Sequence, residues 1–272
     1  MASGKIGWLD KDKKALTIVS GLNHPSIHLL NLDAQCVLLD HGCDVGHAVQ
    51  QKDAVTSATD TSKVAAFDIL AAHVHRKGRI VTFHMTTSGI AGSFKPKATG
   101  KLAGAGVLSY VWPTSLDPSV VGFEGKTGIL VLAATSHPDF DDTPLYDEDG
   151  DGNPGNDGSK WHSHWIVLTP TEQCGPGALG VRDIPKDETP AMPATWPGLP
   201  IFLDSPGMTP LFDGPEVKIH TSFSSGTVID GADYDGVTNA LKVNANVHAP
   251  LLCVTDVFDV ASGDLSLPGK VN

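Results

Sequence analysis

The chain has 272 residues, 40% of them apolar and 18% charged, which is the composition of a folded globular protein with a substantial core. Its 19 basic and 31 acidic side chains give a formal net charge of −12, which argues against nucleic-acid binding and against charge-driven attachment to anionic lipid. No window approaches about 18 consecutive apolar residues, so the sequence predicts no transmembrane helix and no membrane partner.

Short strands dominate the predicted secondary structure. Runs rich in Val, Ile and Leu, bounded by Gly, Pro, Asn or Asp, recur along the chain, as strands do. The predicted strands are 16–20, 36–39, 67–75, 79–86, 106–112, 128–135, 162–169, 217–223, 241–247 and 251–257. One short helix is predicted over 45–54, capped by Asp44. The pattern predicts an all-β chain, an antiparallel β-sandwich or distorted barrel of about ten strands with long loops.

We expect residues 1–272 to form a single all-β domain, with residues 1–60 as a candidate N-terminal arm. Ten of the 19 prolines fall in 170–215, which argues against a long helix or a central strand there. The same segment carries Trp196 and Phe202, which a solvated linker would not need. We therefore predict a long Pro-rich loop packed on the domain, where it walls a pocket.

Four cysteines, Cys36, Cys43, Cys174 and Cys253, allow three disulfide pairings, and the sequence does not choose among them. Cys36 and Cys43 are close enough for a small disulfide loop, and four buried thiols are the alternative. The first residues do not resemble a signal peptide, which read literally predicts a cytoplasmic protein. A calcium-type loop and few lysines instead favour a periplasmic or secreted protein whose signal has been replaced.

The first histidine pair, His73 and His75, lies in one predicted strand, where residues two apart share a face. A two-residue turn at 77–78 would pair Ala71 with His84 across the hairpin. His84 would then lie diagonal to His73 on the same face, about 7–8 Å away at the backbone. The order resembles the histidines of a cupin motif, but no Glu lies between His75 and His84, so no cupin residue is assigned.

The second pair, His162 and His164, also shares one face of a predicted strand, with Trp161 and Trp165 on the other. Imidazole nitrogens suit zinc, copper or iron. We therefore predict one mononuclear transition-metal centre, whose ligands come from His73, His75, His84, His162 and His164. The alternatives are that the two pairs lie on different sheets or face solvent.

Four residues are candidates for roles beside this centre. Asp139 and Glu172 could orient an imidazole or act as a general base, as could Asp141, and His137 could belong to the same site. The metal would act as a Lewis acid or lower the pKa of bound water, and iron or copper could instead activate oxygen.

A run of alternating acidic residues precedes the second histidine pair. Asp147, Asp149 and Asp151 followed by Gly152 match the first half of a calcium loop, whereas the twelfth position is Gly158 instead of the usual Glu. The expected ligands are Asp147, Asp149, Asp151, Asn153 and Asp157. We predict a structural calcium loop, and a solvated acidic turn is the alternative.

The sequence thus favours a metal-dependent enzyme of open reaction class, acting on a small, partly apolar substrate. The alternative is a non-enzymatic, calcium-stabilised β-sandwich that binds a small-molecule ligand. A metal-storage or metal-delivery protein is a third hypothesis. The sequence leaves the oligomeric state open.

Overall fold

The computed structural model describes residues 53–272 except 225, 247 and 249, and also the backbone of five short strands nearer the N-terminus. The chain divides into two compact units, Met1–Gln50 and Gln51–Asn272. The strands of the first unit are β1 (Ile6–Asp10), β2 (Ala15–Ser20), β3 (Ser26–Asn31), β4 (Leu38–Leu39) and β5 (Gly42–Cys43). The predicted Cys36–Cys43 loop and residues 44–52 of the predicted helix with its cap lie outside the residues whose side chains are described.

The second unit is built around a closed antiparallel barrel, which confirms the predicted all-β fold. Six strands follow one another in the order β10-β9-β17-β18-β12-β11, and β11 pairs back onto β10. They are β9 (Gly106–Pro113), β10 (Ile129–Ser136), β11 (His162–Pro170), β12 (Leu179–Val181), β17 (Val237–Val243) and β18 (Leu252–Val260). The short strand β13 (Leu203–Asp204) pairs with the outer part of β11.

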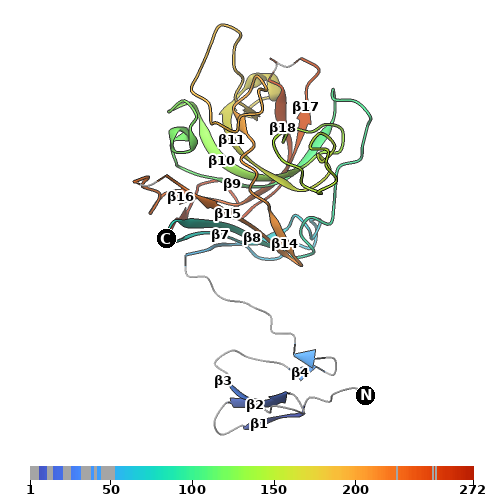
Figure 1. Ribbon diagram of the computed structural model, residues 1–272, viewed down its shortest axis with the longest axis vertical. Coiled ribbons are helices and arrows are strands. Elements are labelled where there is room, and N and C mark those ends of the chain that lie inside the picture. Colours follow the sequence, from blue (N-terminus) through green and yellow to red (C-terminus); the bar gives the residue numbers. More distant parts are fainter. Residues whose placement is uncertain are drawn as a thin grey trace. The chain divides into compact units, whose positions relative to one another are not determined.

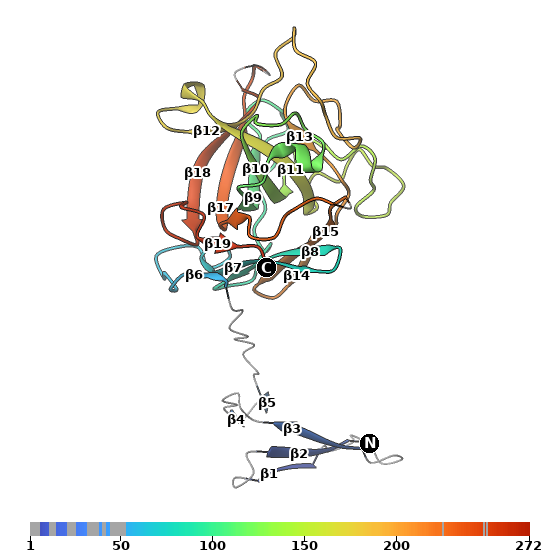
Figure 2. The ribbon, with the colours of Figure 1, turned by 90° about the vertical axis from the view of Figure 1, so that its left-hand side faces the viewer.

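A five-stranded antiparallel sheet packs against the outside of the barrel, and Figures 1 and 2 show it beneath the barrel. Its strands, in sheet order, are β14 (Leu211–Asp213), β15 (Glu216–Ser222), β8 (Ile80–Thr87), β7 (Ile69–Lys77) and β6 (Val55–Thr56). A two-stranded pair, β16 (Asp233–Tyr234) with β19 (Gly269–Lys270), completes the strands of the described part.

Successive side chains of a barrel strand point alternately into the barrel and outward toward the five-stranded sheet. The second unit therefore has two apolar cores. One cluster draws on all six barrel strands and fills the barrel, and it includes Val131 and Ala133 of β10. The other joins the barrel to the five-stranded sheet and includes Leu132 of β10. In it, Phe83 of the sheet makes edge contacts with Trp112 and Trp165 of the barrel, at ring-centroid distances of 6.0 and 5.7 Å.

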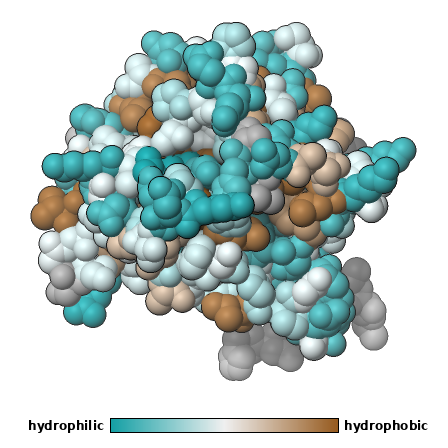
Figure 3. Space-filling view, turned by 90° about the horizontal axis from the view of Figure 1, so that it is seen from above, coloured by the Kyte–Doolittle hydropathy of each residue, from teal (hydrophilic) through white to brown (hydrophobic). Residues whose placement is uncertain are grey.

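Helix is confined, in the described residues, to two 3-10 turns, η1 (Pro118–Val121) and η2 (Glu172–Cys174). Within that same part of the chain, no helix is long and apolar enough to cross a membrane. Seen from above, the surface is mostly hydrophilic, and its apolar side chains form small separate groups (Figure 3).

The second unit has about fourteen strands, more than the ten predicted for the whole chain. The Pro-rich segment 170–215 contains three of those missed, including the barrel strand β12. That strand is only three residues long and free of proline, so the proline count of the whole segment concealed it. The strand predicted at 241–247 is β17, which begins four residues earlier and ends at Val243.

The seam between β12 and β18 is narrow, because the two strands share a single ladder pair, Gly180 with Cys253. A disulfide joins Cys174 to Cys253 across this seam. A Cβ at Gly180 would lie 3.1 Å from the Cys174 sulfur and 2.7 Å from the Pro250 ring, so the seam requires glycine. The disulfide therefore reinforces the barrel where its hydrogen bonding is weakest.

The β7–β8 hairpin turns one residue later than predicted, at Gly78 and Arg79, and Lys77 pairs with Ile80. Gly78 has φ +66°, the left-handed conformation that a tight hairpin favours at its first turn residue. The later turn shifts the register by two, so that His73 lies directly opposite His84 instead of diagonal to it. A shift of two preserves the shared face.

Candidate metal centre

Three histidines point into one end of the barrel. His162 and His164 lie on the same face of β11 as Ile166 and Leu168, which belong to the barrel core, so all four side chains point into the barrel. The two histidines pair across the ladder with Thr135 and Ala133 of β10. His137 follows the last residue of β10 and continues the inward parity of Ala133 and Thr135, so it enters the same space.

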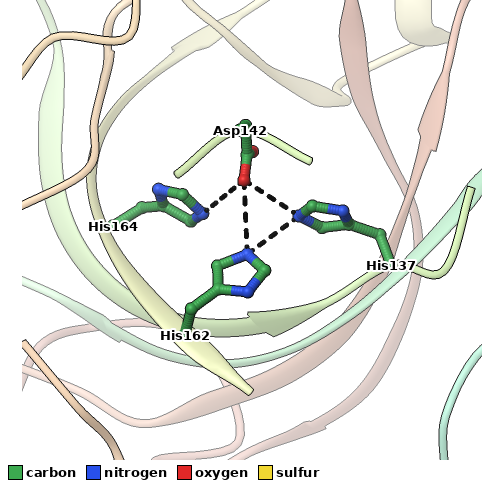
Figure 4. Close-up of side chains that lie close together, drawn as sticks. All are labelled: His137, Asp142, His162 and His164. Atoms are coloured by element: carbon green, nitrogen blue, oxygen red, sulfur yellow. Dashed lines mark hydrogen bonds and ion pairs between the residues drawn. The ribbon is translucent and has the colours of Figure 1, made fainter. Parts of the chain in front are cut away.

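Asp142 completes the cluster, as Figure 4 shows. Its Oδ1 lies 3.2 Å from His137 Nε2, 3.3 Å from His162 Nε2 and 3.2 Å from His164 Nε2. The Nε2 atoms of His137 and His162 are 2.9 Å apart. All four side chains are at most 4% exposed. One carboxylate oxygen and three imidazole nitrogens therefore face one small, buried volume.

Each imidazole is held from behind by a backbone carbonyl. His137 Nδ1 donates to Phe140 O and His162 Nδ1 to Lys160 O, both at 2.9 Å. His164 Nδ1 donates to Asp204 O at 3.2 Å. A carbonyl oxygen only accepts, so Nδ1 carries the proton in all three rings and a neutral ring presents its Nε2 lone pair inward. Metal-binding histidines in proteins are oriented by such carbonyl contacts.

The inward lone pairs create an electrostatic conflict that a cation resolves. Two neutral imidazoles with Nε2 atoms 2.9 Å apart repel each other, and each also faces the Asp142 carboxylate. Although burial favours the neutral acid, the charges of His164 and His137 hold the pKa of Asp142 well below its ordinary value. Burial lowers the pKa of His162 to about 4. Burial also opposes protonation of His137, but Asp142 raises the pKa of that ring. Either one shared proton or a metal ion is therefore needed here.

The size of the cluster suits a first-row transition metal. Four donors placed tetrahedrally at about 2.0–2.1 Å from a metal lie about 3.3 Å from one another. The three distances from Asp142 Oδ1 to the Nε2 atoms and the distance between His137 and His162 Nε2, 2.9 to 3.3 Å, are close to this value before any adjustment of the rings. Imidazole with one carboxylate suits zinc, iron, copper or nickel better than calcium, which takes oxygen ligands.

A buried hydroxyl without a partner lies beside the cluster. Thr135 is 3% exposed, has the inward parity of His137 and pairs directly with His162. Its Oγ1 has no hydrogen-bond partner among the described residues. A buried hydroxyl of this kind calls for a water or a ligand oxygen. The orphan hydroxyl therefore leaves room for an additional small molecule beside the four candidate donors.

The loop between β10 and β11 closes tightly beneath the cluster. His137 N donates to Gly158 O at 2.7 Å, and Ser136 Oγ donates to Ser159 O at 3.0 Å. A Cβ at Gly158 would lie 1.8 Å from Phe140 O, so only glycine fits. This contact fixes the segment that carries His137 and Asp142 against the chain that leads into His162.

The acidic residues of the same loop form a second, exposed group. One carboxylate oxygen from each of Asp147, Asp149 and Asp151 lies within 4.8 Å of the others. Asp147 accepts from the backbone N–H of Gly152 at 2.7 Å, which wraps the loop around its carboxylate. Lys160 lies 3.4 Å from Asp149 and supplies part of the countercharge.

The two other predicted calcium ligands differ from each other in burial. Asn153 is exposed and donates its N–H to Asp151 at 2.8 Å. Asp157 is fully buried, and its Oδ2 accepts from Glu148 N at 2.8 Å. This bond to the backbone between Asp147 and Asp149 places the Asp157 carboxylate beside the acidic group, and burial together with the charges of Asp149 and Asp147 raises its pKa.

The first histidine pair does not join the metal cluster. His73, His75 and His84 belong to the five-stranded sheet and lie on the face opposite Val74 and Phe83, which pack against the barrel. The His73 and His75 rings stack with centroids 4.9 Å apart. The expected meeting of both pairs at one centre fails because β7 and β8 lie outside the barrel, whereas β11 forms part of its wall.

Of the candidate catalytic residues, only His137 reaches the cluster. Asp139 accepts from the N–H groups of Thr99 and Gly100 at 2.7–2.9 Å, and Glu172 is an exposed residue of η2. Asp142 was not among the candidates. It lies in the irregular loop after Asp139, where no periodicity indicates which carboxylate turns inward.

No protein-family model matches this chain, and comparisons with curated proteins and with solved structures returned no match. The case for function therefore rests on the geometry of the site.

Proposed function

We propose that this chain is a metal-dependent enzyme that binds one first-row transition-metal ion through His137, Asp142, His162 and His164. The observation that carries the proposal is the convergence of three Nε2 atoms and one carboxylate oxygen, with every Nδ1 fixed by a carbonyl. The donor set favours zinc, copper or iron.

The catalytic role rests on the orphan Thr135 hydroxyl. A closed structural site with four protein donors needs no neighbouring polar group, whereas a buried Oγ1 without a partner fits a water or substrate oxygen beside the metal. The metal would supply Lewis acidity or a hydroxide near neutral pH, or would activate oxygen if it is iron or copper. Thr135 would orient the oxygen, and the apolar barrel core would exclude bulk water from a small, partly apolar substrate.

The acidic group of the loop is the proposed structural calcium site. Asp147, Asp149 and Asp151 supply oxygen donors from one turn, as calcium requires, and the buried Asp157 is hydrogen-bonded to the backbone of that turn at Glu148 N. We also place the protein in the periplasm or outside the cell, because the Cys174–Cys253 disulfide is of the kind that persists in oxidising compartments.

The experiment is elemental analysis of the dialysed, tag-free protein and of two matched double variants. His162→Ala with His164→Ala should abolish a near-stoichiometric transition metal. His73→Ala with His75→Ala removes an equivalent His-x-His pair from the other sheet and should leave that metal in place. Loss of metal in the second variant but not in the first would contradict the proposal.

The alternative, a non-enzymatic ligand-binding module, is favoured by one feature. A cleft of about 700 Å³ lies on the outer side of β11, lined by Trp165, Met208, Phe223 and part of the Pro-rich segment, Pro193–Thr195. Polar side chains, among them Asp204 and His220, line it as well, and such a mixed wall suits a small organic ligand. A binding module would keep its ligand affinity after the transition metal is removed, whereas the enzyme would lose turnover.

A further inference from the structure

One loop carries parts of both candidate cation sites. Residues 137–161 join β10 to β11 and contain His137 and Asp142 of the buried centre. The same 25-residue segment contains the whole acidic triad, Asp147, Asp149 and Asp151, and leads directly into His162. The conformation of this loop therefore bears on both sites.

A chain of short hydrogen bonds links the two sites through the loop. Asp141 accepts from Thr143 N at 2.8 Å, so its carboxylate braces the backbone on the far side of Asp142. The other oxygen of Asp141 accepts from Asp157 N at 2.7 Å. Asp157 in turn accepts from Glu148 N at 2.8 Å, between two residues of the triad. The path from the acidic loop to Asp142 thus passes through two carboxylates.

The acidic triad is accompanied by a second feature that indicates a bound cation. Asp157 is fully buried, yet its Oδ1 has no hydrogen-bond partner among the described residues. The buried Oε2 of Glu148 is likewise without one in that part of the chain. Buried carboxylate oxygens are normally paired, and the open oxygen of Asp157 belongs to the carboxylate that is bonded to Glu148 N within the triad, so it points to a cation there.

We infer that calcium bound at the acidic loop is a positive effector of the buried centre and tightens its hold on the transition metal. The inference rests on the proposed function. Calcium would fix residues 147–157, and the Asp157–Asp141 link would then hold Asp142 at its donor position. Ordering the loop costs conformational entropy, which weakens binding of the transition metal. Because bound calcium would already have ordered the loop, the transition metal would bind without that cost.

The coupling is measured with the full chain, Co²⁺ as the spectroscopic probe and Ca²⁺ as the effector. Protein stripped of metal by a chelating resin is titrated with Co²⁺ at zero and at 2 mM Ca²⁺, with 2 mM Mg²⁺ as a control. We expect Ca²⁺ to lower the Kd for Co²⁺ about tenfold, within the usual range of allosteric coupling. Linkage requires Co²⁺ to lower the Kd for Ca²⁺ by the same factor.

Two variants separate the coupling from binding. Asp141→Asn keeps every proposed ligand but has one acceptor oxygen where Asp141 uses two, so the bonds from Thr143 N and Asp157 N cannot both persist. Both ions should still bind, while the tenfold effect is lost. Asp117→Asn changes a carboxylate that also accepts two backbone N–H groups, in the β9–β10 connection, and should keep the effect.

The outcomes distinguish the two claims. Binding of Co²⁺ with an affinity that Ca²⁺ does not change, or no binding of Ca²⁺, would overturn the coupling and leave the metal centre standing. An absence of Co²⁺ binding with and without Ca²⁺ would overturn the proposed function itself. Persistence of the full effect in Asp141→Asn would refute the proposed route.

Discussion

Asp142→Asn is the substitution that separates the charge of the cluster from its shape. Asparagine has nearly the volume of aspartate but cannot carry the negative charge that faces three imidazoles at 3.2–3.3 Å. Removing one partner of a buried ion pair costs about 3–5 kcal/mol. For a folded unit of this size, each 1 kcal/mol lowers Tm by about 2–4 °C, so the metal-free variant should melt about 6–20 °C below the wild type.

The same substitution should weaken transition-metal binding by at least about 100-fold, because even the loss of a group behind a ligand costs 10–100-fold. The assay is a chelator competition with Zn²⁺, combined with thermal unfolding of the metal-free proteins.

The matched control is Asp235→Asn. Asp235 is equally buried, but its carboxylate accepts from Gly236 N and from the Ser262 N–H and hydroxyl, and no imidazole is among these partners. It should lose some stability and keep its Zn²⁺ affinity within about twofold, since distant sites act independently. Wild-type Zn²⁺ affinity in Asp142→Asn, or equal losses of affinity in both variants, would show that Asp142 is not a metal ligand.

Three further predictions concern the disulfide and the titrating histidines. Replacing Cys174 and Cys253 by Ala opens a loop with a sequence separation of 79 and should lower the free energy of unfolding by up to about 4.5 kcal/mol. Urea unfolding measures this loss, and an unchanged midpoint would contradict it. Zn²⁺ binding at pH 7 should release about one proton, namely the proton shared by His137 and His162 in the metal-free site. The number of protons released is measured from the way the calorimetric binding enthalpy depends on the buffer, and a value of zero would count against a protonated metal-free site. Burial and the nearby Lys218 lower the pKa of His84 to about 4, so between pH 6.5 and 4 the unfolded state binds more protons than the folded state. The free energy of unfolding should therefore fall by up to about 3 kcal/mol as the pH drops through that window. His84→Gln should flatten this pH dependence, and a slope equal to that of the wild type would disprove the assignment.

Periodicity in strands explains why part of the site was predictable. The His-x-His of β11 reads directly as two side chains on one face, and the flanking tryptophans indicate which face packs outward. His137 is found by continuing the same alternation one residue beyond the end of β10. Asp142 has no such signal, because its inward direction is set by the closure of an irregular loop on Gly158.

Which strands are neighbours was not predictable. The pair at His73 and His75 has the same local pattern as the pair on β11, and only the long-range strand order places one outside the barrel and the other in its wall. Strand order is set by packing across the whole chain, and the spacing of two neighbouring histidines carries no information about that packing. The hairpin register also depended on whether the turn began at Lys77 or Gly78.

The most direct test of the metal centre is an anomalous diffraction map, recorded at the absorption edge of the metal found by elemental analysis. We expect one strong peak about 2.0–2.2 Å from the Nε2 atoms of His137, His162 and His164 and from Asp142 Oδ1. A metal-loaded crystal with no peak among these four atoms, or with its peak beside His73 and His75, would contradict this expectation.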